Sequence, residues 1–425
     1  MKGKHYKLKK DVGLLSAVFY GVGIILGAGI YALLGVGAGM AGNAIWISFA
    51  IAAIIATFTG LTYAELSSRY PKEAAEYVYT KHAFNRKMLS FVVEWIFIVI
   101  GIISAATVSL GFANYFTHIF GGEVLIVAAV LIALLSILNY IGIKDSARFT
   151  ILSTIIEMGG LVIIVLIGIF FFKPDINFFE MPESGFFGVL SATALIFFAY
   201  IGFEEVVNVS EETKNAKKIM PRALLISLVI STILYILVSI AAVSVVGWET
   251  LATSKAPLTE VASQAFGVNA GLIMSIIALF ATSNTVLVTL IVVSRLFYGL
   301  ANNRSFPHAC ARIGKRGTPY ISVFLAMALV IAALFIGNLK TVALLTDIGI
   351  FTIYILINLS LIFIRFHDKK EPPFKSPVNI GRFPVLALLG LLSAAAMFAF
   401  FDPMLILFEI GVIIVGAVAY KVFNR

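Results

Sequence analysis

Two long apolar segments of the chain are interrupted near their middle by glycine. The first reads Gly-Val-Gly-Ile-Ile-Leu-Gly-Ala-Gly-Ile over residues 21–30, and the second reads Phe-Phe-Ala-Tyr-Ile-Gly-Phe-Glu-Glu over residues 197–205. Hydrocarbon offers no water to backbone N–H and C=O groups. A helix that unwinds inside a bilayer must therefore turn these groups toward protein, a cavity or a ligand. Two such breaks in matching places indicate the binding site of a transporter.

The composition places the chain in a membrane. Of its 425 residues, 60% are hydrophobic and 12% are charged, and its mean hydropathy is +1.03, which is foreign to a water-soluble globule. Each crossing of a bilayer needs about 20 apolar residues, and the sequence predicts an all-α integral membrane protein with twelve transmembrane helices. The spans lie approximately at 13–40, 42–66, 88–118, 122–141, 147–172, 185–208, 221–247, 267–300, 319–337, 341–365, 383–400 and 403–422.

The basic residues predict the orientation of these spans. If the N-terminus is cytoplasmic, 28 of the 31 Lys and Arg residues fall on the cytoplasmic side, and the exceptions are Lys173, Lys255 and Lys340. This asymmetry follows the positive-inside rule. We therefore expect a multi-pass protein of the cell membrane with both termini in the cytoplasm. The net charge of +9 then reflects topology and contact with lipid, and it predicts no nucleic-acid partner.

Several kinds of chemistry have no signal in the sequence. There is no Walker A motif, no GxGxxG after a strand, no zinc-ligand spacing and no Ser/His/Asp context. We therefore expect neither an ATP-driven pump nor an enzyme, and neither a cofactor nor a bound metal. A single cysteine, Cys310, excludes an internal disulfide.

The two breaks also predict an internal repeat. They fall in spans 1 and 6, which are the first members of two successive groups of five helices. Because five is odd, the second group must enter the membrane upside down, which gives a 5+5 inverted repeat. We expect one membrane domain over residues 1–425, with repeats at about 13–172 and 185–366 and two extra helices at about 383–422. The polar stretches at 68–87 and 367–382 are expected to be loops.

The break in span 1 has a polarity that suits a zwitterion. A half-helix that restarts near Ala28 presents unpaired N–H groups and the positive end of its dipole, which favour a carboxylate. The half-helix that ends near Ile24 and Ile25 presents carbonyl oxygens, which favour an ammonium group. Together these ends form a receptor for the backbone of an α-amino acid. The alternative is that the small residues only allow close helix packing.

Span 6 adds an aromatic group and an acid beside its break. Phe198 is a candidate gate over the substrate, although aromatic runs in spans more often serve ordinary packing. Glu204 and Glu205 follow in the first turn of the second half-helix, where the dipole stabilises an anion. An ionisable residue inside a span is a functional candidate by default. Glu204 is therefore a candidate proton or gating residue.

Two further polar features lie deep in apolar spans. Glu157 has apolar neighbours for two turns on both sides, so it must bind a cation, pair with a base or stay protonated. Because no Lys or Arg lies comparably deep, protonation or cation binding is favoured. Span 8 carries four consecutive polar residues at 282–285. They either form an inward-facing site or bond back to their own helix.

Several motifs together closely resemble the amino acid-polyamine-organocation (APC) permeases. They are GIILGAGI at 23–30, FAYIGFE at 198–204, EETKNAKKIMP at 211–221, and the stretch from Ser294-Arg295 to ANNRSFP at 301–307. The resemblance covers nearly the whole chain. It implies the leucine-transporter-type fold, with discontinuous helices 1 and 6 and the substrate between spans 1, 3, 6, 8 and 10.

The resemblance also implies residue roles. Gly27, Ala28 and Gly29 would supply N–H groups to the substrate carboxylate. Ile25, Ala199 and Ile201 would supply carbonyls to its amino group, Phe198 would be the gate and Glu204 the acid. The candidate substrate-binding residues are Ile25, Gly27, Ala28, Gly29, Ile30, Phe198, Ala199, Ile201 and Gly202.

One position departs from the family pattern. Proton-coupled and sodium-independent relatives often carry a lysine in span 5, and Glu157 appears to stand there. Since the charge is reversed, the lysine mechanism does not transfer. We expect Glu157 to face the polar cluster of span 8, including Ser283, and to take up the coupled proton or bind a cation such as sodium. The alternative is a protonated Glu157 that fixes helix packing. The candidate coupling residues are Glu157, Glu204 and Ser283.

These features predict a secondary active transporter of amino acids that works by alternating access. Proton symport is the first expectation for coupling, and exchange of amino acids or polyamines is the second. A non-transporting sensor is disfavoured because no long soluble signalling domain is present. Glu204 or Glu157 would suit a cationic substrate, whereas Ile102, Ile103 and Phe203 would favour a neutral one, which we prefer. The sequence does not set the oligomeric state.

Overall fold

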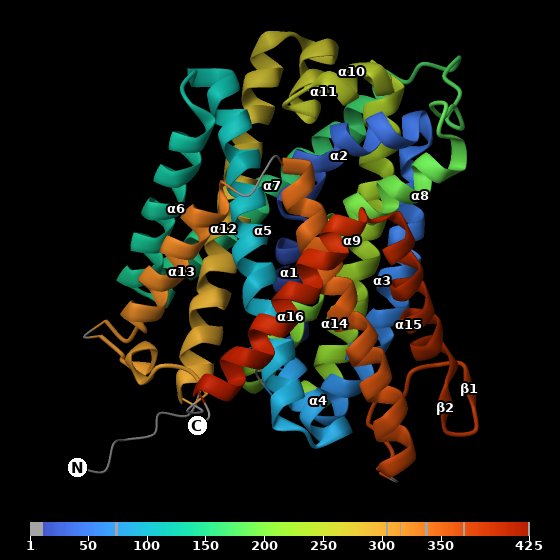
Figure 1. Ribbon diagram of the computed structural model, residues 1–425. Helices are drawn as coiled ribbons and strands as arrows, with labels where there is room; N and C mark the ends of the chain where they lie inside the picture. Colours follow the sequence, from blue (N-terminus) through green and yellow to red (C-terminus); the bar gives the residue numbers. More distant parts are fainter. Residues whose placement is uncertain are drawn as a thin grey trace.

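The computed structural model describes residues 12–72, 75–302, 305–314, 316–335, 339–368 and 370–423, and it is a bundle of helices (Figure 1). Among these residues, nine helical stretches are long and apolar enough to cross a membrane. The first, Leu14–Arg69, has 56 residues, enough for two crossings at about 20 residues each. Two shorter apolar helices cover Tyr320–Ala333 and Val385–Phe400. The multi-pass architecture is confirmed, and the count of twelve stays a prediction.

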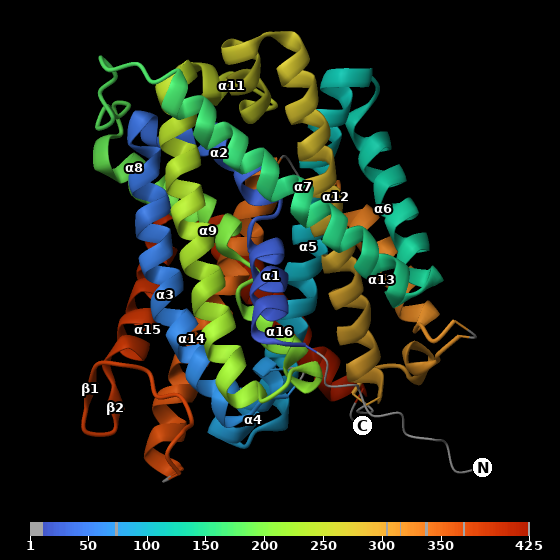
Figure 2. The ribbon, with the colours of Figure 1, turned by 180° about the vertical axis from the view of Figure 1, so that it is seen from behind.

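Both predicted breaks are present. Helix α1 (Leu14–Ile25) is separated from α2 (Ala28–Ala41) by two residues. Helix α8 (Gly185–Ile196) continues as the 3₁₀ helix η2 (Phe197–Tyr200), and three irregular residues separate it from η3 (Glu204–Glu212). The second half of this span is thus a 3₁₀ helix. In Figure 2, α1 lies below α2.

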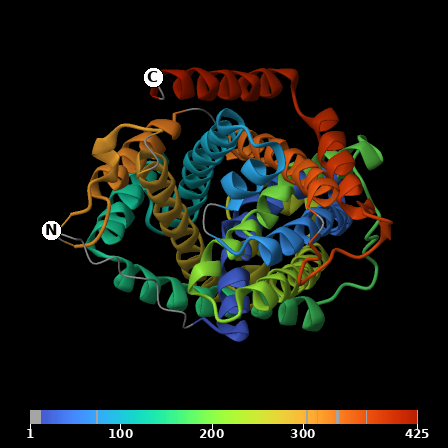
Figure 3. The ribbon, with the colours of Figure 1, turned by 90° about the horizontal axis from the view of Figure 1, so that it is seen from below.

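Long helices pack around the broken ones. Helices α9, α7, α5 and α12 contact α1 or α2, and α3 packs along α9. The last helix, α16, lies along the outside of the bundle against α5 and α14 (Figure 3). The bounds of these helices are α3 Ile45–Arg69, α5 Lys87–Phe120, α6 Val124–Ile141, α7 Ile143–Phe170, α9 Ala216–Val246, α12 Val268–Asn302, α13 Tyr320–Ala333, α14 Leu339–His367, α15 Val385–Met397 and α16 Pro403–Phe423.

The connections contain more structure than expected. The stretch at 68–87 contains the helix α4 (Ala75–Phe84), and the stretch at 367–382 leads into a hairpin of β1 (Asn379–Ile380) and β2 (Phe383–Pro384). Both stretches were expected to be loops, and polarity alone did not reveal their short elements. Helices α10 (Trp248–Thr253) and α11 (Pro257–Phe266) lie at the opposite end of the bundle from α4 (Figure 1). The remaining short elements are η1 (Gly42–Ala44), η4 (His308–Ala311) and η5 (Phe398–Phe400).

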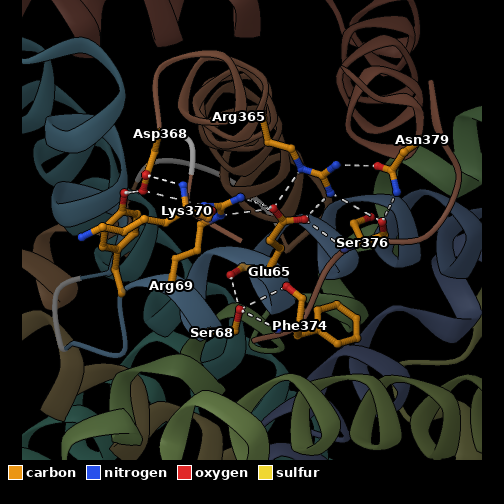
Figure 4. Close-up of polar contacts among 10 residues, drawn as sticks. Glu65, Ser68, Arg69, Arg365, Asp368, Lys370, Phe374, Ser376 and Asn379 are labelled. Carbon is orange, nitrogen blue, oxygen red and sulfur yellow. Dashed lines mark hydrogen bonds and ion pairs between the residues drawn. The ribbon is translucent and has the colours of Figure 1, made fainter. Parts of the chain in front are cut away.

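A buried ion-pair network holds the α4 end of the bundle together (Figure 4). Glu65 of α3 is fully buried and accepts two hydrogen bonds from Arg365 of α14, one of them at 2.9 Å between Nε and Oε1. Arg69 lies 3.0 Å from the same carboxylate, and the Ser376 N–H donates to it at 2.9 Å. Asn379 in the hairpin accepts from Arg365. The network therefore joins α3, α14 and the hairpin.

Candidate functional site

The two breaks lie directly against each other. Gly202 has φ +118°, and a Cβ added there would stand 2.4 Å from Cγ2 of Ile24. A Cβ on Gly29 would stand 2.4 Å from the Cα of Ala199. No other residue type fits such an approach or such a dihedral angle without strain. These glycines allow close packing, and the same packing brings the unwound backbone of spans 1 and 6 into one site.

A cavity opens beside the contact between the breaks. Its walls come from both breaks, α5, α12 and one residue of α14. Eight of the nine predicted substrate-binding residues and Glu204 line it. The lining residues are Gly23, Ile24, Ile25, Gly27, Ala28, Gly29, Phe97, Ile100, Gly101, Ser104, Phe198, Ala199, Ile201, Gly202, Glu204, Glu205, Asn284, Thr285, Val288, Thr289, Val292 and Ile350.

Three of the predicted substrate-binding and coupling residues lie outside the cavity lining. Ile30 is fully buried in the apolar core. Glu157 is fully buried, and neither of its carboxyl oxygens has a hydrogen-bond partner among the described residues. The hydroxyl of Ser283 donates to the carbonyl of Phe280 in its own helix at 3.0 Å. The expected contact between Glu157 and Ser283 is therefore not made through a hydrogen bond.

The polar backbone at the breaks is already partly satisfied. The N–H of Ala28 donates to Oγ1 of Thr285 at 3.1 Å. The hydroxyl of Tyr235 on α9 contacts two carbonyl oxygens, that of Ala199 at 2.8 Å and that of Ile25 at a shorter distance. Tyr235 was not identified from the sequence. Since a carbonyl oxygen has two lone pairs, both carbonyls can still accept a hydrogen bond from a ligand.

Glu204 accepts hydrogen bonds from the break in span 6 and from a neighbouring helix. Its Oε2 accepts from the N–H of Gly202 at 3.0 Å and from the hydroxyl of Tyr354 on α14 at 3.0 Å. Its Oε1 has no partner among the described residues, although the side chain is 1% exposed. The acid thus lies at the start of η3, as predicted, with one oxygen available to a proton or a ligand.

Much of the cavity lining is apolar. Phe97 and Ile100 of α5, with Gly101 and Ser104, repeat at the spacing of one helix face and line the cavity. Ile102 and Ile103 of the same helix do not line it, and neither does Phe203. The expected apolar lining is present, but different residues supply it. Val288, Val292 and Ile350 add further apolar surface.

Two further buried acids were missed in the sequence. Asp347 of α14 is fully buried, and both its carboxyl oxygens lack a hydrogen-bond partner among the described residues. Oε1 of Glu409 on α16 is also buried and also lacks a hydrogen-bond partner among the described residues. The signal was available, because both acids interrupt predicted spans. Among the described residues, no group of three or more His, Cys, Asp or Glu side chains is placed to hold a metal ion.

Comparison with known proteins gives matches over nearly the whole chain. A family model described as amino acid permease matches residues 12–419. The chain is 29% identical to the branched-chain amino acid permease BcaP of Bacillus subtilis, over 98% of this chain and 94% of that protein. It is 27% identical to the methylthioribose transporter of the same organism, over 92% and 88%. It is 30% identical to the chloroplastic cationic amino acid transporter 9 of Arabidopsis thaliana, over 72% and 58%.

Proposed function

The chain belongs to the amino acid permease family and is a membrane transporter rather than an enzyme, and we propose that it carries amino acids across the cell membrane by proton-coupled alternating access. The observation that carries this proposal is the cavity between the two breaks. Unwound backbone of both spans and the acid Glu204 meet there. The 5+5 inverted repeat and cytoplasmic termini are part of the proposal.

The substrate backbone would bind between the two half-helix ends. Its carboxylate would approach the N–H groups at Gly27, Ala28 and Gly29, where the positive end of α2 favours an anion. The hydroxyl of Thr285 accepts from Ala28 and donates to the carbonyl of Ala281 at 3.2 Å, and it would turn its proton from that carbonyl to the carboxylate. A hydroxyl can do both.

The substrate ammonium would lie at the carbonyls of Ile25, Ala199 and Ile201. The hydroxyl of Tyr235 already lies against two of these carbonyls and shares its one proton between them. Their free lone pairs would accept N–H donors from the ammonium. Tyr235 would then position the receptor, and Phe198, which lines the cavity at 5% exposure, would cover the substrate.

The lining supports a neutral apolar side chain on the substrate. Phe97, Ile100 and Val292 contribute apolar surface, and Val288 and Ile350 extend it. Burying an apolar side chain there is favourable by about 25 cal/mol per Å². The branched-chain amino acid permease among the relatives supports the same assignment. A cationic side chain is the second candidate, because Glu204 and Glu205 also line the cavity.

Proton coupling rests on buried acids. Glu204 has one oxygen without a described partner and would gain or lose a proton as the cavity changes its access. Glu157, with neither oxygen partnered, would bind a proton or a cation near span 8. Sodium coupling and amino acid exchange are the competing modes.

Uptake into proteoliposomes tests the proposal directly. A panel of labelled amino acids would be offered under an imposed pH gradient, under a sodium gradient and with unlabelled amino acid inside. We expect neutral apolar amino acids to accumulate under the pH gradient alone. Accumulation under sodium alone would overturn proton coupling, and exchange without accumulation would assign an exchanger. If no amino acid accumulates or exchanges, the proposed substrate class is wrong.

A further inference from the structure

Outside the cavity, another acid is buried at the α4 end of the bundle. Glu76 of α4 is 4% exposed, and Tyr63 of α3 donates its hydroxyl to Oε1 at 3.0 Å. Burial raises the pKa of Glu76 to about 7, the nearby Glu205 adds to the rise, and the hydrogen bond from Tyr63 acts in the opposite direction. Glu76 therefore changes its charge near neutral pH.

Aromatic side chains connect Glu76 to the cavity. The ring of Tyr63 meets the rings of Phe203 and Tyr354 edge-on, at centroid distances of 6.0 and 6.2 Å. Tyr354 in turn donates its hydroxyl to Glu204. The two tyrosines thus hold one carboxyl each, Glu76 and Glu204, on either side of one aromatic cluster.

Glu205 connects the cavity to the surroundings of Glu76. It lines the cavity together with Glu204, and its charge contributes to the raised pKa of Glu76. Repulsion between neighbouring carboxyls favours the state in which one of them holds a proton. No described group of acids is placed to hold a metal ion that would relieve the repulsion. The titratable groups that face Glu76 are Tyr63 on α3, Glu94 on α5, Glu205 on η3, Tyr354 on α14 and Tyr79 on α4 itself.

We propose that Glu76 is the group that releases the coupled proton to the cytoplasm. The proton leaves the carboxyl of Glu204, is taken up by Glu205 and then by Glu76, and passes to water at the α4 end of the bundle. Each transfer returns the donor to a carboxylate. This inference rests on the proposed proton-coupled function and on its orientation, in which the α4 end faces the cytoplasm.

The first test replaces the acid. Glu76→Gln keeps the size and an oxygen that can accept from Tyr63, but it cannot carry the proton. Under a pH gradient, we expect the labelled amino acid to reach the same concentration inside as outside and to accumulate no further. Exchange of labelled for unlabelled amino acid at equal pH should continue. Glu371→Gln, at an exposed position, is the matched control and should behave as the unmodified protein.

The second test keeps Glu76 and shifts the pH at which it releases its proton. Raising the internal pH through about 7 should speed uptake, because Glu76 then releases its proton. Tyr63→Phe removes the hydrogen bond that favours the carboxylate, so the midpoint should shift upward by about 0.5–1 pH unit. A purely structural role of Glu76 would leave this midpoint unchanged.

The outcomes separate this inference from the proposed function. If the unmodified protein accumulates amino acids under a pH gradient and Glu76→Gln does so equally, Glu76 is not the releasing group and proton coupling stands. If Glu76→Gln does not fold, an unshifted midpoint in Tyr63→Phe overturns the inference. If the unmodified protein shows no proton-driven accumulation, the coupling and the inference both fall.

Discussion

Two buried carboxylates of this protein, those of Glu65 and Glu204, have opposite kinds of hydrogen-bond partners. At the α4 end, Glu65 accepts hydrogen bonds from Arg365, Arg69 and the backbone of Ser376. Beside the cavity, Glu204 accepts from an N–H and a tyrosine hydroxyl and keeps one oxygen without a described partner. Two guanidinium groups bind the carboxylate of Glu65, whereas the two hydrogen bonds described for Glu204 come from neutral groups. The first region therefore holds helices together, and we assign change of charge to the second.

The ion-pair network offers the largest expected effect. Arg365→Met would leave Glu65 buried with one cation fewer, which costs about 3–5 kcal/mol of stability. The measurement is thermal unfolding in detergent. Arg69→Met is the comparison variant, and we expect a smaller loss because Glu65 keeps Arg365 and the Ser376 N–H. Equal losses in the two variants would contradict a central role for Arg365.

The cavity region depends on the close approach of the breaks. Gly202→Ala places a Cβ against Ile24 and forces an alanine to φ +118°, so we expect a loss of about 1–3 kcal/mol of stability together with loss of transport. Gly159→Ala in α7 is the control, because a Cβ there meets no atom within 4 Å. The readout is initial uptake per folded molecule. Equal uptake by both variants would show that the contact of the breaks is dispensable.

Glu204→Gln tests the comparison most directly. The amide oxygen can still accept from Gly202 and Tyr354, so we expect thermal unfolding to stay nearly unchanged. Since an amide cannot carry the proton, accumulation under a pH gradient should fall to equilibration while exchange continues. If Glu204→Gln unfolds much more easily but the folded fraction accumulates amino acids normally, then Glu204 has a structural role and no role in coupling.

The smallest expected effect concerns Tyr235. Tyr235→Phe removes the hydroxyl that holds the carbonyls of Ile25 and Ala199. Loss of one hydrogen bond of about 0.5–1.5 kcal/mol corresponds to a rise of about 2–10-fold in KM, and we expect kcat to change less. Uptake kinetics at varied substrate concentration measure both. An unchanged KM would mean that Tyr235 only packs.

Glycine made part of this architecture predictable. The break after Ile25 and the irregular residues around Gly202 follow from glycine in apolar spans. Helix rotation was not predictable. Of the four polar residues at 282–285, Ser283 was chosen, but Asn284 and Thr285 line the cavity. Consecutive residues point about 100° apart, and the sequence does not state which direction faces the site.

Other misses have a different physical origin. Tyr235 lies in an ordinary apolar span, and its role depends on where α9 meets the two breaks, which is a tertiary contact. Asp347 was visible as a carboxyl within a span and was overlooked. The helix α4 with Glu76 was obscured by its polar composition. Features that depend on contacts between distant segments, such as the position of Tyr235 at the two breaks, could therefore not be predicted from the residue pattern.

The length of α12 gives the site a mechanical property. The helix has 35 residues, or about 52 Å at 1.5 Å per residue, and Thr285, the partner of Ala28, is its eighteenth residue and stands at the midpoint. Its two ends pack against α11 and η4. A rigid tilt of about 10° around that midpoint would carry the ends about 4.5 Å in opposite directions and leave Thr285 in place. The hydroxyl that binds the Ala28 N–H in the cavity wall thus lies at the point of α12 that such a tilt moves least.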